Sequence, residues 1–145
     1  MKLLFFTTII FFFAIPTERK TFNDNEHIKV ELIFPTKIRQ FDTSQKLQFH
    51  FSPNNGIHVN TDPSIEFVID KKSEFEVVGE PSVKKNKKGY LAITKPVEVS
   101  FKAKKNTPPG KYPLKGSLRY FFCSDKDGWC NRHSQDVELI IEITK

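Results

Sequence analysis

Apolar and polar residues alternate with a period of two along most of the chain from about residue 22 onward. The first such run places Ile28, Val30 and Leu32 on one side of an extended backbone. A period of two is that of a β-strand with one face against a core and the other toward solvent. The pattern predicts strands over residues 28–34, 47–52, 97–102, 118–123 and 137–143, and a more apolar, central strand over residues 65–69.

The breaks between these runs hold residues that favour turns. Pro, Asn, Asp and Gly gather at residues 53–56, 60–63, 84–89 and 107–110. No helical stripe interrupts the pattern, so we predict an all-β fold, an immunoglobulin-like antiparallel β-sandwich of about seven or eight strands. The length of 145 residues suits one such domain over residues 27–145, preceded by a loose polar arm at residues 17–26.

The first sixteen residues carry a different pattern. Lys2 is followed by mostly apolar residues as far as Ile15, and Pro16 ends the run. One positive charge before a short apolar run is typical of a secretory signal peptide, whereas a membrane-spanning helix needs about 20 apolar residues. We therefore predict a signal peptide over residues 1–16 and a periplasmic or secreted protein, with an uncleaved membrane anchor as the alternative.

Composition and charge exclude several classes of protein. With 38% hydrophobic and 28% charged residues, the chain can form a packed core and does not belong to the disordered class. Two cysteines are too few for a disulfide-dense miniprotein or a four-cysteine zinc module. The net charge of +6 includes a lysine cluster at residues 84–88, which we assign to a solvated loop tip. We expect no nucleic-acid partner, no small-molecule substrate and no bound cofactor.

The two cysteines flank a predicted turn. Cys123 ends a predicted strand, Gly128 suits a backbone with positive φ, and Cys130 precedes the last strand. A hairpin with one cysteine on each arm brings the two Cα atoms into disulfide range. Alternation places Cys123 on the face opposite Leu118 and Tyr120, where we expect it to be accessible to a partner.

These residues leave three interpretations of the cysteine pair open. A structural disulfide across so short a loop would stabilise the fold by about 2.5 kcal/mol. A redox pair would exchange its disulfide with a partner protein. A soft site for Cu(I) or Zn would use Cys123, Cys130 and His133 as metal ligands. No spacing of Ser, His and Asp, or of paired carboxylates, indicates a hydrolytic site.

Two segments of the chain are similar to a known family. They are Gly56-Ile-His58-Val-Asn60, and Tyr112-x-Leu-x-Gly116-x-Leu-x-Tyr120-x-x-Cys123 followed by a turn and Cys130. In order, spacing and strand pattern they resemble the N-terminal periplasmic domain of the disulfide reductase DsbD, of the disulfide-bond corrector family. The resemblance covers about residues 28–143 and implies an immunoglobulin-like fold.

The resemblance also implies that Cys123 and Cys130 are a catalytic redox pair, with Cys130 as the cysteine that joins the partner. In the family, this pair takes electrons from a membrane-embedded thiol donor and passes them to periplasmic thioredoxin-like proteins. The implied activity is that of a thiol:disulfide oxidoreductase, and the alternative is a non-enzymatic binding or adaptor module with a structural disulfide. Six residues separate the cysteines here, one more than is usual in the family, and we expect the domain to act in trans.

Two other residues near the cysteines receive a structural interpretation. Alternation turns His58 outward or toward a rim, where we expect it to form a structural hydrogen bond. Trp129 directly precedes Cys130, and we expect it to pack over the disulfide, with contact to a partner as the alternative.

Overall fold

The computed structural model describes Ile9 and residues 14–145 of the chain. Most of the predicted signal peptide, residues 1–16, lies outside the described residues, and residues 14–16 are exposed and belong to no strand. The described part of the chain contains no helix that is long and apolar enough to cross a membrane.

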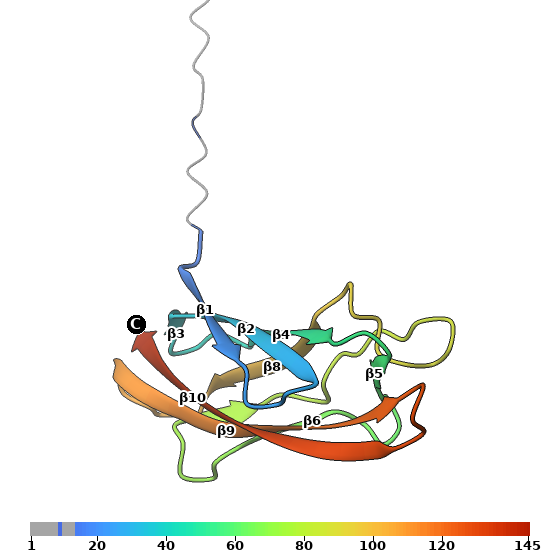
Figure 1. Cartoon of the computed structure of the whole chain (residues 1–145). Coiled ribbons are helices and arrows are strands. Elements are labelled where there is room, and N and C mark those ends of the chain that lie inside the picture. Colours follow the sequence, from blue (N-terminus) through green and yellow to red (C-terminus); the bar gives the residue numbers. More distant parts are fainter. Residues whose placement is uncertain (1–8, 10–13) are drawn as a thin grey trace, which may run out of the picture.

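The described residues form ten β-strands in two stacked sheets (Figure 1). The first sheet has the order β1 (Thr17–Phe22), β2 (Ile28–Pro35), β4 (Gln45–Pro53), β8 (Val97–Ala103) and β7 (Phe75–Val77). The second has the order β3 (Lys37–Arg39), β10 (Cys130–Thr144), β9 (Gly110–Ser124) and β5 (Ile57–Val59), and β6 (Glu66–Ile69) also pairs with β9. Every pairing is antiparallel except that of β3 with β10. The predicted all-β, immunoglobulin-like antiparallel sandwich is confirmed, with ten strands instead of the predicted seven or eight.

The alternating apolar residues fill the space between the two sheets. In β2, for example, Ile28, Val30 and Leu32 are at most 1% exposed, as their spacing predicted. Aromatic contacts join the layers, since the ring centroids of Phe49 on β4 and Phe67 on β6 are 5.3 Å apart. Burial of one such side chain contributes about 1.5–3 kcal/mol, so this core fixes how the sheets stack.

The expectation of a loose arm at residues 17–26 is wrong over its first part. Residues 17–22 form β1, which pairs with β2 along its whole length. Five of its six residues are exposed and only Phe22 is buried, so its side chains carry no apolar alternation. Backbone hydrogen bonding to β2 forms the strand, and an ion pair between Arg19 and Glu31 (3.2 Å) spans the two strands. An edge strand of this kind leaves no trace in hydrophobic periodicity.

The strand β6 differs from the prediction in its place in the sheet. Its apolar sequence indicated a central strand, but among the described strands it pairs with β9 alone, and Val68 is 48% exposed. The strands β9 and β10 are longer than the runs that predicted them, at 15 residues each, and span roughly 50 Å. The turn that joins them lies at the end of the sandwich opposite the C-terminus (Figure 1).

Candidate functional site

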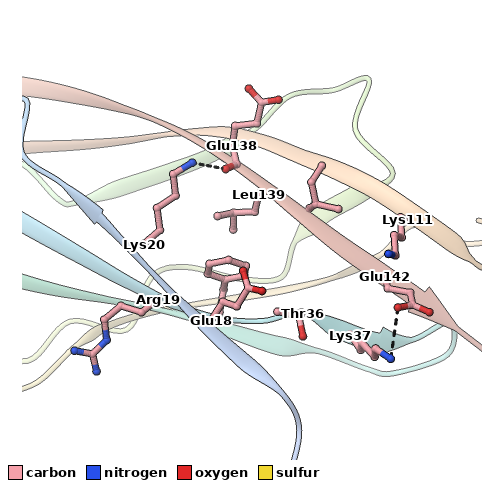
Figure 2. A pocket seen from close by; sticks show the side chains of 11 residues that line it. Glu18, Arg19, Lys20, Thr36, Lys37, Lys111, Glu138, Leu139 and Glu142 are labelled. Atoms are coloured by element: carbon pink, nitrogen blue, oxygen red, sulfur yellow. Dashed lines mark hydrogen bonds and ion pairs between the residues drawn. The ribbon is translucent and has the colours of Figure 1, made fainter.

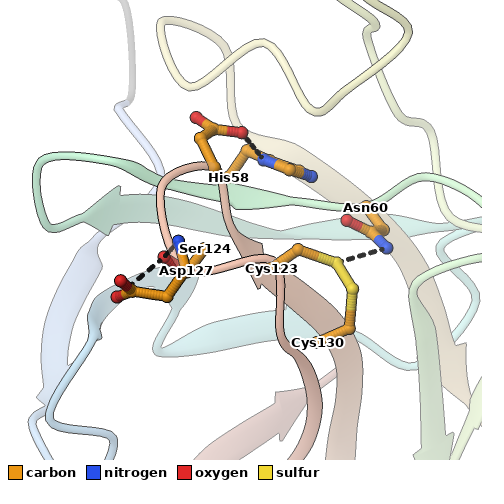
Figure 3. Close-up of a disulfide and its surroundings, with 7 residues drawn as sticks. His58, Asn60, Cys123, Ser124, Asp127 and Cys130 are labelled. Carbon is orange, nitrogen blue, oxygen red and sulfur yellow. Dashed lines mark hydrogen bonds and ion pairs between the residues drawn. A yellow bond between two sulfur atoms is a disulfide. The ribbon is translucent and has the colours of Figure 1, made fainter.

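Cys123 and Cys130 face each other at the last residue pair of the β9–β10 ladder. The next pair along the hairpin, Ser124 and Trp129, is hydrogen-bonded, because the backbone N–H of Ser124 donates to the carbonyl of Trp129 (2.9 Å). Pairs alternate along an antiparallel ladder, so the cysteines form a non-hydrogen-bonded pair, in which the two Cα atoms lie closest. The two Cα atoms are 4.0 Å apart and the sulfur atoms form a disulfide (Figure 3). Gly128 closes the turn with a φ of +70°, a conformation that favours glycine. The predicted hairpin with one cysteine on each arm is confirmed.

The two cysteines differ sharply in exposure. Cys123 is only 7% exposed, whereas Cys130 is an exposed residue. Cys123 lies on the face of β9 opposite Tyr120, as alternation predicted, but the expectation that it is accessible is wrong. The reason is β5, which pairs along the other edge of β9 and places His58 directly opposite Cys123. The accessible cysteine of the pair is Cys130.

His58 ties the turn after Cys123 to its neighbours. Its Nδ1 lies 2.5 Å from the carboxylate of Asp125 (Figure 3), and the backbone N–H of Asp125 donates to the carbonyl of Gly56 (2.8 Å). The His58 ring stacks on Tyr90, with centroids 3.6 Å apart. The expected structural hydrogen bond of His58 is therefore confirmed, and the residue connects three segments around the disulfide.

Asn60 is the residue at this site whose contact the sequence did not reveal. Its Nδ2 donates a hydrogen bond to Sγ of Cys123 at 3.4 Å (Figure 3), and its backbone N–H donates to the carbonyl of Phe121 (2.8 Å). The side-chain Oδ1 of Asn60 is buried and has no hydrogen-bond partner among the described residues. An amide N–H that points at sulfur favours the thiolate over the thiol. The signal available in sequence was the position of Asn60 within the first DsbD-like segment.

The structure does not bring the three alternative metal ligands together. His133 is the register partner of Tyr120, and their rings lie 5.5 Å apart on the core face of the sheet. Its Nε2 is 3.4 Å from the carboxylate of Asp24. Alternation along β10 puts His133 and Cys130 on opposite faces, so His133 cannot share a ligand site with Cys123 and Cys130. Within the described ranges, no three His, Cys, Asp or Glu side chains gather around a common metal position.

Trp129 packs against its neighbours, but the expectation that it lies over the disulfide is wrong, because it contacts Phe122 on the opposite face of the hairpin. Its ring centroid lies 4.9 Å from that of His27 and 5.9 Å from that of Phe122, in an edge-on contact. These contacts fix the start of the last strand against the core, on the side away from the disulfide.

A cleft of about 450 Å³ lies elsewhere in the molecule, between β1 and β10 (Figure 2). Two of its lysines are already engaged, since Lys20 donates to the backbone carbonyl of Glu138 (2.8 Å) and Lys37 pairs with Glu142 (3.6 Å). Along β10, residue 138 is roughly 26 Å from Cys130. The cleft is therefore separate from the disulfide and adds no reactive group to it.

No protein-family model and no curated protein sequence matches the chain. Among solved structures, the chain is similar to the crystal structure of the GAE domain of yeast GGA1, at 12% identity and a TM-score of 0.38. That match covers 83% of this chain and 98% of the yeast domain. The resemblance to the DsbD family remains a prediction that rests on the two segments quoted above.

Proposed function

We propose that the protein is an exported thiol–disulfide exchange domain, acting as a component of a protein-disulfide reductase through the pair Cys123 and Cys130. The observation that carries the proposal is the asymmetry of the disulfide. Cys130 is exposed, whereas Cys123 is buried and its sulfur accepts a hydrogen bond from Asn60. An exposed sulfur can be attacked by a partner thiolate, and a buried sulfur that faces an N–H donor is a suitable leaving group.

The exchange proceeds in two steps. A thiolate of a partner dithiol attacks Sγ of Cys130, a new S–S bond forms between partner and Cys130, and the Cys123–Cys130 bond breaks. The bonding electron pair leaves on Sγ of Cys123 as a thiolate, which the N–H of Asn60 stabilises. The second partner thiolate then attacks the partner sulfur of the mixed disulfide and releases Cys130 as a thiolate. The partner is oxidised and the pair is reduced by two electrons, and the reverse steps reduce a disulfide in another partner.

The partners that suit this chemistry are proteins with their own reactive cysteine pairs. We propose a membrane thiol donor that reduces the domain and thioredoxin-like periplasmic proteins that receive the electrons, as the DsbD resemblance implies. Stable oxidation of the pair requires an oxidising compartment. The predicted signal peptide at residues 1–16 supports export to such a compartment, either periplasmic or extracellular.

The first test measures the reduction potential of the pair in glutathione or dithiothreitol buffers, with free thiols counted by mass spectrometry. We expect a value between about −270 and −120 mV, the range of proteins that exchange disulfides. A second measurement uses the single variants Cys123→Ser and Cys130→Ser with an oxidised thioredoxin-like protein. Cys123→Ser should trap a mixed disulfide through the exposed Cys130, and Cys130→Ser should trap far less.

A reduction potential below about −300 mV, together with no trapping by Cys123→Ser, would overturn the proposal. The disulfide would then be a structural bridge in a non-enzymatic binding module. In that case the double Cys→Ser variant loses about 2–3 kcal/mol of stability and keeps its binding function.

A further inference from the structure

A strongly basic hairpin lies beside the disulfide. Residues 84–89, here called the lysine hairpin, hold four exposed lysines: Lys84, Lys85, Lys87 and Lys88. None of the four forms an ion pair with another described residue. No Asp or Glu occurs between Glu80 and Glu98, so the charge of this segment is not balanced locally. Four unpaired cations on one short turn form a concentrated positive surface.

The backbone of the lysine hairpin is held in one conformation. The side chain of Asn86 accepts hydrogen bonds from the backbone N–H groups of Lys88 (2.9 Å) and Tyr90 (3.1 Å). Backbone bonds close the turn, from Asn86 N–H to the Tyr90 carbonyl and from Ala92 N–H to the Lys84 carbonyl, both at 2.8 Å. The lysines therefore project from a defined loop, so binding a partner requires little ordering of the backbone.

Three contacts attach the lysine hairpin and the two residues after it to β5, next to the disulfide, and to Thr61 just beyond β5. The Tyr90 ring stacks on His58, which is the register partner of Cys123. The hydroxyl of Thr61 donates to the carbonyl of Gly89 (2.7 Å), and the N–H of Leu91 donates to the carbonyl of Val59 (2.9 Å). In Figure 1 the loop lies at the same end of the sandwich as β5 and the β9–β10 turn. The position of the lysines relative to the cysteines is thus set by the fold.

The cysteine hairpin adds two more cations to this end of the molecule. Lys126 is exposed in the turn, and Arg132 is exposed two residues after Cys130 on the same face of β10. The carboxylates nearest in the chain are already engaged in part, since Asp125 contacts His58 and Asp127 contacts the hydroxyl of Ser124. Asp62 follows Thr61, and Asp24 and Glu26 lie beside His133 and His27, so six cations stand against five carboxylates at this end.

We propose that the lysine hairpin, with Lys126 and Arg132, is the docking surface for an acidic face of the protein that exchanges thiols with Cys130. This inference rests on the proposed function and identifies its partner by charge. Opposite charge steers encounter and accelerates association, most strongly at low salt. A protein is favoured over a membrane because residues 84–89 contain no apolar side chain, and the half-exposed Ile93 beside them offers little apolar area to a lipid layer.

The test uses two synthetic peptides of equal length that carry one cysteine, flanked by glutamates in one and by glutamines in the other. The oxidised full-length protein is mixed with each, and the rate of mixed-disulfide formation is measured at low and at high salt. We expect the acidic peptide to react about tenfold faster at low salt, and the difference to vanish at high salt. The variant K84Q/K85Q/K87Q/K88Q should lose most of this preference.

A matched control removes the same charge far from the disulfide. The variant K71Q/K72Q/K105Q/K111Q replaces four exposed lysines and should keep the preference for the acidic peptide. If both quadruple variants lose the preference for the acidic peptide equally, the net charge of the protein causes the preference and the docking surface is disproved. Equal rates for the two peptides with the wild-type protein at low salt also overturn the proposal. The proposal is also overturned if the wild-type protein binds phosphatidylglycerol vesicles, the K84Q/K85Q/K87Q/K88Q variant does not, and neither protein prefers the acidic peptide.

The docking surface and the exchange reaction can fail separately. A serine version of the acidic peptide cannot react, and its affinity reports docking alone. If dithiothreitol reduces the pair readily but the serine peptide binds no better than its neutral counterpart, the exchange function is supported and the docking surface is disproved. If the serine peptide binds through the lysine hairpin while the pair resists reduction, the docking surface is supported and the exchange function is disproved.

Discussion

At the scale of single residues, the surroundings of the two sulfur atoms decide what the disulfide can do. Cys130 is exposed at the start of β10, and Cys123 is covered by its β5 neighbours. Asn60 adds a directed hydrogen bond to Sγ of Cys123 and leaves its own buried Oδ1 without a partner. A buried oxygen without a hydrogen-bond partner lowers the stability of the folded protein. The side chain of Asn60 is therefore not explained by stability, and its role lies in the N–H group that it directs at the sulfur.

The variant Asn60→Leu tests this role, because leucine has a similar volume and no N–H donor. Loss of the hydrogen bond destabilises the Cys123 thiolate and so disfavours reduction. If this hydrogen bond stabilises the thiolate by about 1 kcal/mol, its loss should make the reduction potential more negative by about 20 mV. Exchange with a thioredoxin-like protein should slow about fivefold. Both are measured with the full-length protein, by thiol counting and stopped-flow kinetics.

The variant Asn60→Asp provides the matched comparison, because its carboxylate repels the thiolate and should lower the potential further. Removal of the unsatisfied Oδ1 leaves the folding stability of Asn60→Leu close to that of the wild type. An unchanged potential in Asn60→Leu would show that the amide only fills space beside the sulfur.

At the scale of elements, the long strand β9 holds the second sheet together. One edge pairs with β10, and the other carries β6 and β5 in succession. The closest approach occurs at Gly116, where an added Cβ would lie 2.7 Å from the carbonyl oxygen of Val68 and 2.9 Å from the Phe67 ring. Only a residue without a side chain lets β6 dock here, which accounts for the glycine in the second DsbD-like segment.

The variant Gly116→Ala should therefore lose about 1–3 kcal/mol of stability, because the backbone of β6 must shift to relieve the contact. Urea denaturation followed by Trp129 fluorescence measures this as a lower midpoint with an unchanged slope. The neighbouring Ser117→Ala, whose hydroxyl contacts Ser134 at the surface (2.8 Å), is the control and should cost less than about 0.5 kcal/mol. A loss in Gly116→Ala no larger than that of the control would contradict the packing argument.

At the scale of the whole molecule, a buried tyrosine joins the sheets and couples stability to pH. Tyr120 is fully buried and makes an edge-on contact with Phe51 of the opposite sheet. Burial raises the pKa of Tyr120 to about 12; the hydrogen bond from Asn25 to its hydroxyl lowers this pKa, and the charge of Asp24 raises it. In the unfolded chain a tyrosine titrates near pH 10.

Between about pH 10 and pH 12 the unfolded chain therefore loses the Tyr120 proton while the folded protein keeps it. Stability falls as pH rises through this window, by at most about 3 kcal/mol from this residue, and is unaffected by it below pH 10. The variant Tyr120→Phe has no titrating hydroxyl at this position, so its stability should not show the fall that Tyr120 causes above about pH 10. The stability difference between wild type and variant, measured by urea denaturation, should stay constant from pH 7 to 9 and change in favour of the variant above pH 10. A constant difference up to pH 12 would refute the assignment.

The longer buried strands and the cysteine hairpin could be predicted because their signals are local, whereas β1 and the three-residue strands β3 and β7 were not predicted. Each buried strand has to alternate its own side chains, and the turn at Gly128 needs its own backbone conformation. The site could be predicted only in part. The sequence places Cys123 on the outer face of β9, but its burial depends on β5, which lies more than sixty residues earlier in the chain.

By itself, the sequence determined that this protein is an all-β sandwich with a cysteine hairpin between its last two strands, and it identified most of the apolar residues of the core, but not Ile38, Phe75, Leu91 or Leu114. Only the tertiary structure decided which cysteine is exposed, that Asn60 contacts Cys123, that His133 lies on the opposite face, and where the lysine hairpin sits. Periodicity reports the two faces of one strand, because side chains alternate along it. It carries no information about which distant segments pair along a strand's edges, and those pairings decide what covers the disulfide.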